Sequence, residues 1–402
     1  MKQPIFKFFT SPRNLYIIGF IIIVGLSFSE VFRGRQNTFR IFYESTRLFW
    51  DGIVPYGDTW KLMASGLDNF IYGPVFNVFF TPFAFLPEWL SPYVWNIFNY
   101  TLYFLAIFTL PNKYTLEEKC KTFLFTFLIL ATTQLAFQYN PTIAYLFVFA
   151  FSLLERNKPF WAIMLILFSG FTKIYGIFQL GLLVCYPKFW RNILYVAIGC
   201  VFFFFLPAIN VKIGNIFSYY QNWVDMLVNH QDTRTWDTFF YIQPWGNITS
   251  IRMYIQIGTL LALVSLLFVN HKKFKSFEFR AQVPGILMGW LILFSNVAEK
   301  HTYVIALLGY MLWYWSMPYL NSSSTTKLLD KILFYAAFFI MVIVPIDILC
   351  PPFIMRFLFY KLSLNLWLFT FIWFRMCFVT FIKDFLPYQR RVVLTLTMRH
   401  PK

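Results

Sequence analysis

Charged residues are scarce in this chain of 402 residues: only 13% are Asp, Glu, Lys or Arg, whereas 59% are hydrophobic and 23% aromatic. An ordinary water-soluble domain carries about 25% charged residues. This composition, with a mean hydropathy of +0.59, excludes a water-soluble globule. We therefore expect a polytopic membrane protein.

Cysteine and histidine are also few, at five and four residues. The cysteines lie in or beside apolar segments without paired spacing, which argues against a disulfide framework and against a metal site. The histidines show no metal-ligand spacing along a helix. We therefore expect neither a bound metal nor a cofactor.

Acidic residues are outnumbered by basic ones, 17 to 34, which gives a net charge of +17. If the N-terminus is inside, most of the basic residues fall on the inner connections between apolar segments, as the positive-inside rule requires. The positive charge therefore indicates membrane topology, and we expect no nucleic-acid partner.

The apolar segments predict an all-α protein with about twelve transmembrane helices. We expect one integral domain over residues 1–402, with two long polar outer loops at about 33–71 and 209–252. The segment 72–87 is expected to be a short re-entrant or interfacial element. The predicted spans lie near residues 15–32, 92–110, 121–137, 141–154, 159–171, 174–187, 192–208, 253–270, 282–298, 302–318, 332–350 and 362–382.

Charged side chains interrupt the apolar pattern at two places that this topology puts on the outer side. Lys173 interrupts the apolar stretch 160–186, and Glu299, Lys300 and His301 separate two spans without a linker. Charge at the membrane boundary is costly, so these positions are candidates for a functional site.

Each of these residues also has a purely structural explanation. Lys173 can be a lysine whose ammonium group reaches the membrane interface, or the partner of an acid on a neighbouring helix. Glu299 can pair with Lys300, and a single interfacial histidine such as His301 is commonly structural.

Several short motifs follow one another along the chain. They are Asn37–Tyr43, Tyr72–Phe76, Thr81–Pro87, Gln138–Asn140, Thr172–Tyr175 and Ala298–Tyr303. In this order they resemble the GT-C superfamily of membrane glycosyltransferases. The resemblance is specifically to its bacterial alpha-mannosyltransferase-like branch, which depends on polyprenyl-phosphate-mannose.

The resemblance implies a GT-C-like enzyme that transfers a hexose, expected to be mannose. The donor would be a polyprenyl-phosphate-linked sugar, which is already activated, and the acceptor a lipid or a glycan. The reaction would take place on the outer face of the plasma membrane, expected to be a bacterial inner membrane, among membrane lipids.

The resemblance also implies site residues, with one departure from the family pattern. Where the family usually carries an Asp as the expected base, this chain has Asn37, and an amide cannot accept a proton at neutral pH. We expect Glu299 to replace it, with His301 orienting Glu299 or acting in its place. Asp51, Asp58 and Glu44 remain alternative carboxylates for this role.

Phosphate and sugar contacts complete the predicted site. Lys173 is expected to bind the donor phosphate, and Arg40 and Arg47 to share that task. The other predicted substrate-binding residues are Tyr72, Gln138, Asn140 and Tyr303. Outer-loop aromatic residues offer flat faces for sugar rings or a prenyl chain; they are Tyr43, Tyr56, Tyr72, Trp236 and Trp245.

Two other functions remain open from the sequence. A transporter or flippase of lipid-linked sugars predicts acids in mid-span positions and an internal repeat, and Asp347 is the only acid deep in a late span. A catalytically silent relative is compatible with Asn37.

Overall fold

Regular secondary structure is helical throughout the part of the chain that the computed structural model describes, as predicted. The described residues are 10–229, 238–242, 249–295, 298–317, 324–346 and 349–382. The chain divides into two compact units, Met1–Thr235 with Glu299–Ile305 and Trp236–Ala298 with Ala306–Lys402. The single integral domain stays a prediction.

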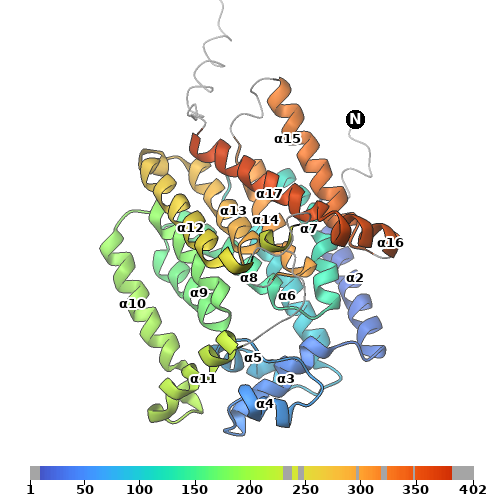
Figure 1. Cartoon of the computed structure of the whole chain (residues 1–402), viewed down its shortest axis with the longest axis vertical. Helices are drawn as coiled ribbons and strands as arrows, with labels where there is room; N and C mark the ends of the chain where they lie inside the picture. Colours follow the sequence, from blue (N-terminus) through green and yellow to red (C-terminus); the bar gives the residue numbers. More distant parts are fainter. Residues whose placement is uncertain are drawn as a thin grey trace, which may run out of the picture. The chain divides into compact units, whose positions relative to one another are not determined.

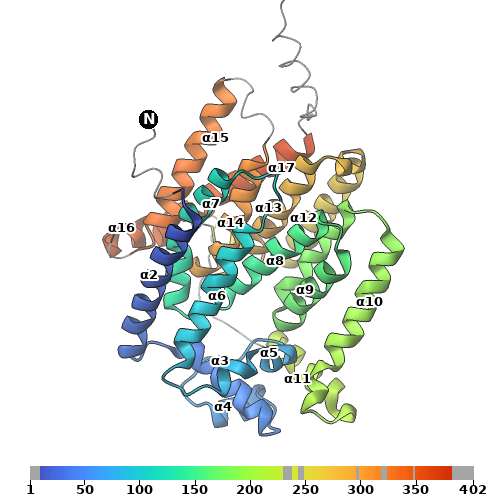
Figure 2. The same ribbon diagram turned by 180° about the vertical axis from the view of Figure 1, so that it is seen from behind.

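Six α-helices of the described part of the first unit overlap predicted spans. They are α2 (Pro12–Phe32), α6 (Ser91–Phe108), α7 (Leu116–Leu135), α8 (Asn140–Glu155), α9 (Pro159–Thr172) and α10 (Phe189–Phe205). Helix α2 packs against α6 and α7, α6 against α8, α8 against α9, and α9 against α10 (Figure 2). Neighbours along the chain are thus mostly neighbours in the unit.

Membrane-spanning character is clear for four helical segments of the described chain. Long and apolar enough to cross a bilayer are Pro12–Phe32, Phe189–Ile209, Arg252–Val269 and Leu364–Ile382. They present apolar side chains such as Ile21 and Val201, which are 64% and 61% exposed, as a lipid-facing surface does. Other apolar helices of the described chain have only 10–17 residues, so the number of about twelve spans stays a prediction.

The segment 33–71, predicted as a polar loop, contains helices α3 (Asn37–Trp50) and α4 (Gly57–Met63). Helix α3 is amphipathic, because Phe39, Phe42 and Phe49 recur at helical spacing and are buried. It packs against α5 (Pro74–Ala84), the predicted short element. Helix α11 (Ile216–Asn229) lies in the second predicted loop. Helices α3, α4, α5 and α11 lie together at one end of the first unit (Figure 1).

The predicted span 174–187 is a 3₁₀-helix, η1 (Ile174–Cys185), and not an α-helix. It packs closely against α9 at Gly176, where an added Cβ would lie 2.2 Å from the carbonyl carbon of Ser169. A 3₁₀-helix rises about 2.0 Å per residue, so its 12 residues extend roughly 24 Å. The chain thus turns back along α9 directly after Lys173.

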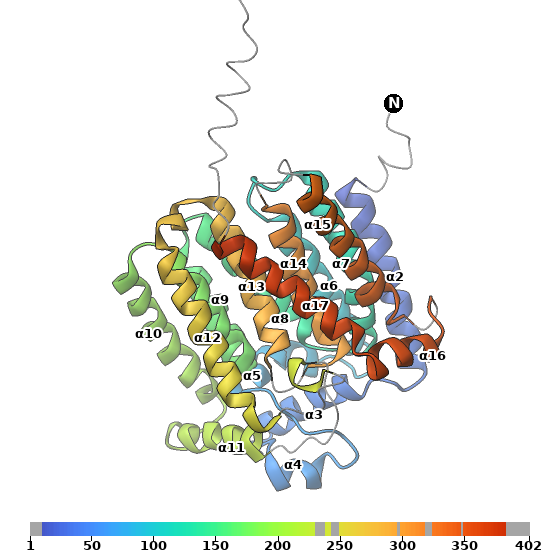
Figure 3. The same cartoon turned by 45° about the horizontal axis from the view of Figure 1, so that its top comes forward.

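The second unit is built from five α-helices of the described residues and their π-helical extensions. The α-helices are α12 (Arg252–Val269), α13 (Phe277–Leu293), α15 (Ser324–Ala337), α16 (Pro352–Met355) and α17 (Leu364–Cys377), together with most of α14 (Tyr303–Trp315). The extensions are η8 (Phe338–Ile343), η9 (Arg356–Lys361) and η10 (Phe378–Ile382). Helix α17 runs across α13 (Figure 3).

A close approach at a glycine and an ion pair join helices of the second unit. At Gly289 a Cβ would lie 2.6 Å from the Trp373 ring, so α13 and α17 approach closely there. The guanidinium of Arg375 on α17 donates two hydrogen bonds of 3.1 Å to the carboxylate of Asp330 on α15. These two side chains are only 12% and 4% exposed, so their charges are compensated within the protein.

Candidate active site

Lys173 lies at the point where α9 ends and η1 begins. Its ammonium nitrogen donates a hydrogen bond of 3.0 Å to Oδ1 of Asn140, the first residue of α8. The same nitrogen lies 5.5 Å from the ring centre of Tyr72 and 5.1 Å from that of Tyr175, within cation–π range. A cation is therefore held between an amide and two aromatic rings.

Backbone contacts at the end of α9 bring Tyr72 to this cation. The amide of Gly73 donates to the carbonyl of Thr172 at 2.9 Å. A Cβ at position 73 would lie 2.1 Å from the carbonyl oxygen of Phe171, so only glycine allows this approach. The hydroxyl of Tyr139 also donates to Oγ1 of Thr172, at 2.8 Å. The segments before α5 and α8 are thus both fastened to the end of α9.

Glu299 precedes the short 3₁₀-helix η7 (Lys300–Thr302) and caps it. The Glu299 carboxylate accepts from the backbone N–H of Thr302, whose hydroxyl accepts from the Glu299 N–H at 3.0 Å. Oγ1 of Thr133 on α7 donates to the carbonyl of His301 at 3.2 Å, which ties η7 to the first unit. The carboxylate is thus fixed in direction by its own helix cap.

Burial and charge change the proton affinities of these groups, which lie between predicted spans. Burial lowers the pKa of Lys173 to about 8, and the Glu299 carboxylate partly opposes this change. Burial, Glu299 and Tyr175 raise the pKa of Tyr72, which is therefore neutral. Burial and Lys300 lower the pKa of His301 to about 4, so its imidazole is neutral at pH 7. Since the Glu299 carboxylate acts on the pKa of both Lys173 and Tyr72, we group these residues together.

Four predicted site residues, Tyr72, Asn140, Lys173 and Glu299, are brought together, and we call them with Tyr175 the Lys173 cluster. Other predicted residues adjoin it in sequence. Gln138 is half-buried two residues before Asn140, His301 is half-buried in η7, and Tyr303 is buried at the start of α14.

The predicted residues of α3 lie elsewhere. Asn37 and Arg40 are exposed on that helix, and among the described residues no hydrogen bond or ion pair joins them to the Lys173 cluster. Arg47 lines a separate pocket of about 390 Å³ with Tyr43, Trp50 and Asp51, and donates to the Tyr43 hydroxyl at 3.1 Å. A role of Arg40 and Arg47 beside Lys173 stays a prediction.

Tyr175, Tyr139 and Thr172 are not among the predicted site residues, although each lies within two residues of one of them. Their presence in the same motifs as Lys173 and Asn140 was the available signal. Trp236, Trp245 and Asp347 lie outside the described residues. Within the described part of the chain, no group of three His, Cys, Asp or Glu side chains forms a metal-binding arrangement.

Four helical segments of the described chain are long and apolar enough to cross a bilayer, and a charged, aromatic-lined cluster lies at the ends of the shorter helices α8 and α9. The model of glycosyltransferase family 87 matches residues 70–315. The chain belongs to this family and is a membrane glycosyltransferase, which uses a sugar donor and an acceptor. No curated protein matches the sequence. All members of the Lys173 cluster lie inside the matched region, whereas Asn37, Arg40 and Arg47 precede it.

The family confirms the sequence-based prediction as far as a membrane glycosyltransferase. The branch that depends on polyprenyl-phosphate-mannose stays a prediction, as do the plasma membrane location and the individual site residues.

Proposed function

We propose that this glycosyltransferase transfers a hexose, mannose by resemblance, from a polyprenyl-phosphate sugar to a hydroxyl of a lipid or glycan acceptor. The reaction would occur on the outer face of a bacterial plasma membrane. The observation that carries the proposal is the Lys173 cluster, in which a cation and a carboxylate interact at the ends of apolar helices.

Lys173 supplies the positive charge that the donor phosphate requires. Its hydrogen bond to Asn140 directs the ammonium group, and the remaining two N–H donors of an ammonium can serve a phosphate oxygen. A phosphate also raises the proton affinity of a neighbouring lysine, so binding favours the charged form. The cation then stabilises the negative charge that develops on the leaving phosphate.

Glu299 is proposed as the general base. The acceptor oxygen forms a bond to the anomeric carbon, while the bond from this carbon to the phosphate oxygen breaks. The electron pair of the broken bond remains on the polyprenyl phosphate, and the hydroxyl proton passes to the Glu299 carboxylate. The products are the glycosylated acceptor, polyprenyl phosphate and one proton.

His301 and Asn37 have lesser proposed roles. The neutral imidazole of His301 is a weak base, but its Nδ1 is buried without a hydrogen-bond partner among the described groups. It can orient an acceptor hydroxyl toward Glu299. Asn37, exposed at the start of α3, carries an amide and takes no proton, which is a further reason to assign the base to Glu299.

The test is transfer by the purified full-length protein in detergent from radiolabelled polyprenyl phosphate mannose to a membrane-lipid extract. We expect a labelled product from the wild type and from Glu88→Gln, a matched exposed carboxylate, and none from Glu299→Gln. If product formed only from nucleotide-activated sugars, the proposal of a polyprenyl-phosphate donor would be refuted. Transfer from no donor of either kind would favour a flippase or a silent relative.

A further inference from the structure

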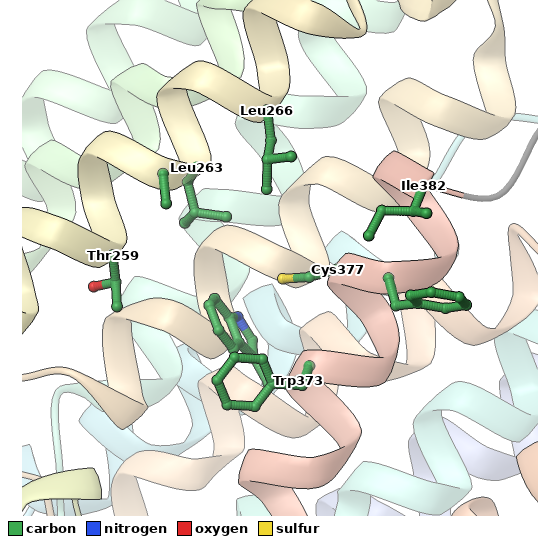
Figure 4. A pocket seen from close by; sticks show the side chains of 9 residues that line it. Thr259, Leu263, Leu266, Trp373, Cys377 and Ile382 are labelled. Carbon is green, nitrogen blue, oxygen red and sulfur yellow. The ribbon is translucent and has the colours of Figure 1, made fainter.

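An apolar pocket of about 420 Å³ lies in the second unit, between α12 and the end of α17 with η10 (Figure 4). Both helical segments are long and apolar enough to cross a membrane. The pocket is lined by Thr259, Ala262, Leu263, Leu266, Trp373, Phe374, Cys377, Phe378 and Ile382. None of these residues belongs to the Lys173 cluster.

The polar groups beside the pocket are used within the protein. The Thr259 hydroxyl donates to the carbonyl of Ile255 at 2.8 Å and accepts from the indole N–H of Trp290 at 2.9 Å. The indole N–H of Trp373 donates to the carbonyl of Ile286 at 3.0 Å. The pocket therefore offers apolar surface to a ligand and no strong hydrogen-bonding group, apart from the weakly polar thiol of Cys377.

A basic segment follows α12 beyond the Leu266 end of the pocket. It is the 3₁₀-helix η6 (His271–Lys275), in which Lys272 and Lys275 are exposed. At about 1.5 Å per residue, Lys272 begins roughly 9 Å beyond Leu266 along the chain. An apolar pocket that ends near lysines matches a molecule with an alkyl chain and a negatively charged head.

We propose that this pocket binds one acyl chain of an anionic phospholipid of the bilayer, whose headgroup phosphate is met by Lys272 and Lys275. Burial of the acyl chain gives no preference for the pocket over the surrounding bilayer, because the lipid tails there are as apolar as the pocket wall. Charge selects the ligand, since juxtamembrane lysines attract anionic headgroups. The predicted topology puts η6 on the inner side, opposite the proposed donor phosphate, which favours a bilayer phospholipid over the donor lipid.

The experiment is a titration of purified full-length protein with phosphatidylglycerol or phosphatidylcholine in detergent, followed by native mass spectrometry. We expect one phosphatidylglycerol to bind in preference to phosphatidylcholine, and to bind less tightly as salt increases. Lys272→Gln and Lys275→Gln should each weaken binding about 5-fold. Lys188→Gln, a change of another exposed lysine, should leave it unchanged.

Filling the pocket tests the acyl-chain contact. Ala262 is exposed and lines the pocket, so Ala262→Phe should occupy its volume without overpacking the core and should abolish the bound lipid. Leu261→Phe is the control, because Leu261 is 61% exposed on α12 and is not a lining residue. Unfolding temperatures of both variants establish that they are folded.

Three results would overturn the proposal. They are unchanged phosphatidylglycerol binding by Ala262→Phe, equal binding of both lipids by the wild type, and displacement of phosphatidylglycerol by equimolar polyprenyl phosphate. The last result would assign the pocket to the donor lipid. Because glycosyl transfer is not the readout, the outcome is independent of the proposed function.

Discussion

The two units each contain a pair of opposite charges in apolar surroundings, and the pairs differ in how completely the protein satisfies them. Arg375 and Asp330 join two helices through two parallel hydrogen bonds and are almost fully buried. Lys173 and Glu299 lie at helix ends, and Lys173 donates to a neutral amide beside two aromatic rings. The first pair resembles a packing device, whereas the Lys173 ammonium keeps N–H donors beyond its bond to Asn140 that a ligand can use.

A substitution of Glu299 gives the most direct test of the difference between the two charge pairs. If this carboxylate is the base, Glu299→Gln should lower the transfer rate by about 10²- to 10⁴-fold. The amide oxygen can still cap η7, so the unfolding temperature should remain close to that of the wild type. Rates and unfolding temperatures measured on the same preparations check this. If Glu299→Gln lowered the unfolding temperature as well as the transfer rate, Glu299 would be a structural residue.

A substitution of Asp330 should lower the stability of the protein and leave its activity unchanged. Asp330→Asn leaves the guanidinium of Arg375 buried without its counter-charge, which costs about 3–5 kcal/mol of folding free energy. Thermal unfolding in detergent measures the loss, and the activity per folded molecule should not change. The control is Asp58→Asn, which removes an exposed partner of Lys61 and should have no measurable effect.

The pH dependence of transfer tests the role of the charge on Lys173. Because burial lowers its pKa to about 8 from an ordinary 10.5, the residue is charged below pH 8 and loses its charge as pH rises through that value. The kcat/KM for the donor should therefore decline above about pH 8, because this parameter reports the protein without bound phosphate. Lys173→Ala should lower kcat/KM by about 10- to 100-fold, as expected for a hydrogen bond to a charged group.

Lys173→Arg supplies the matched control, since a guanidinium stays charged at every pH used. This variant should keep part of the activity and lose the alkaline decline. A decline near pH 8 that persists in Lys173→Arg belongs to another group.

The smallest expected effect is at Gly73. A methyl group there would meet the carbonyl oxygen of Phe171 and move Tyr72 away from Lys173, so Gly73→Ala should reduce kcat/KM by about 10-fold. Gly214→Ala is the control, because nothing lies within 4 Å of a Cβ at that position. Equal activity of the two variants would mean that the position of Tyr72 is unimportant.

Long apolar segments are predictable from sequence, because burial in lipid requires uniform hydrophobicity over many residues. Helices such as α6 and α8 accordingly lie within two residues of the predicted spans 92–110 and 141–154. Amphipathic α3 was predicted as loop, because its polar face lowers its mean hydropathy below that of a span.

The site was partly predictable for a similar reason. Charge at a membrane boundary identifies Lys173 and Glu299 without a structure, because such charge is costly. Their mutual interaction is not visible in the sequence, nor is the pairing of Arg375 with Asp330, since 45 residues separate the two partners. Tyr175 was missed because interfacial aromatic residues are abundant and most of them contact lipid or pack.

Donor binding by the two cluster variants tests the division of roles most directly. Radiolabelled polyprenyl phosphate mannose would be titrated against purified wild type, Glu299→Gln and Lys173→Ala without acceptor. We predict that Glu299→Gln binds the donor with the wild-type Kd, although it makes no product, and that Lys173→Ala binds it at least about 10-fold more weakly. Wild-type donor affinity in Lys173→Ala would contradict the assignment of Lys173 to the donor phosphate.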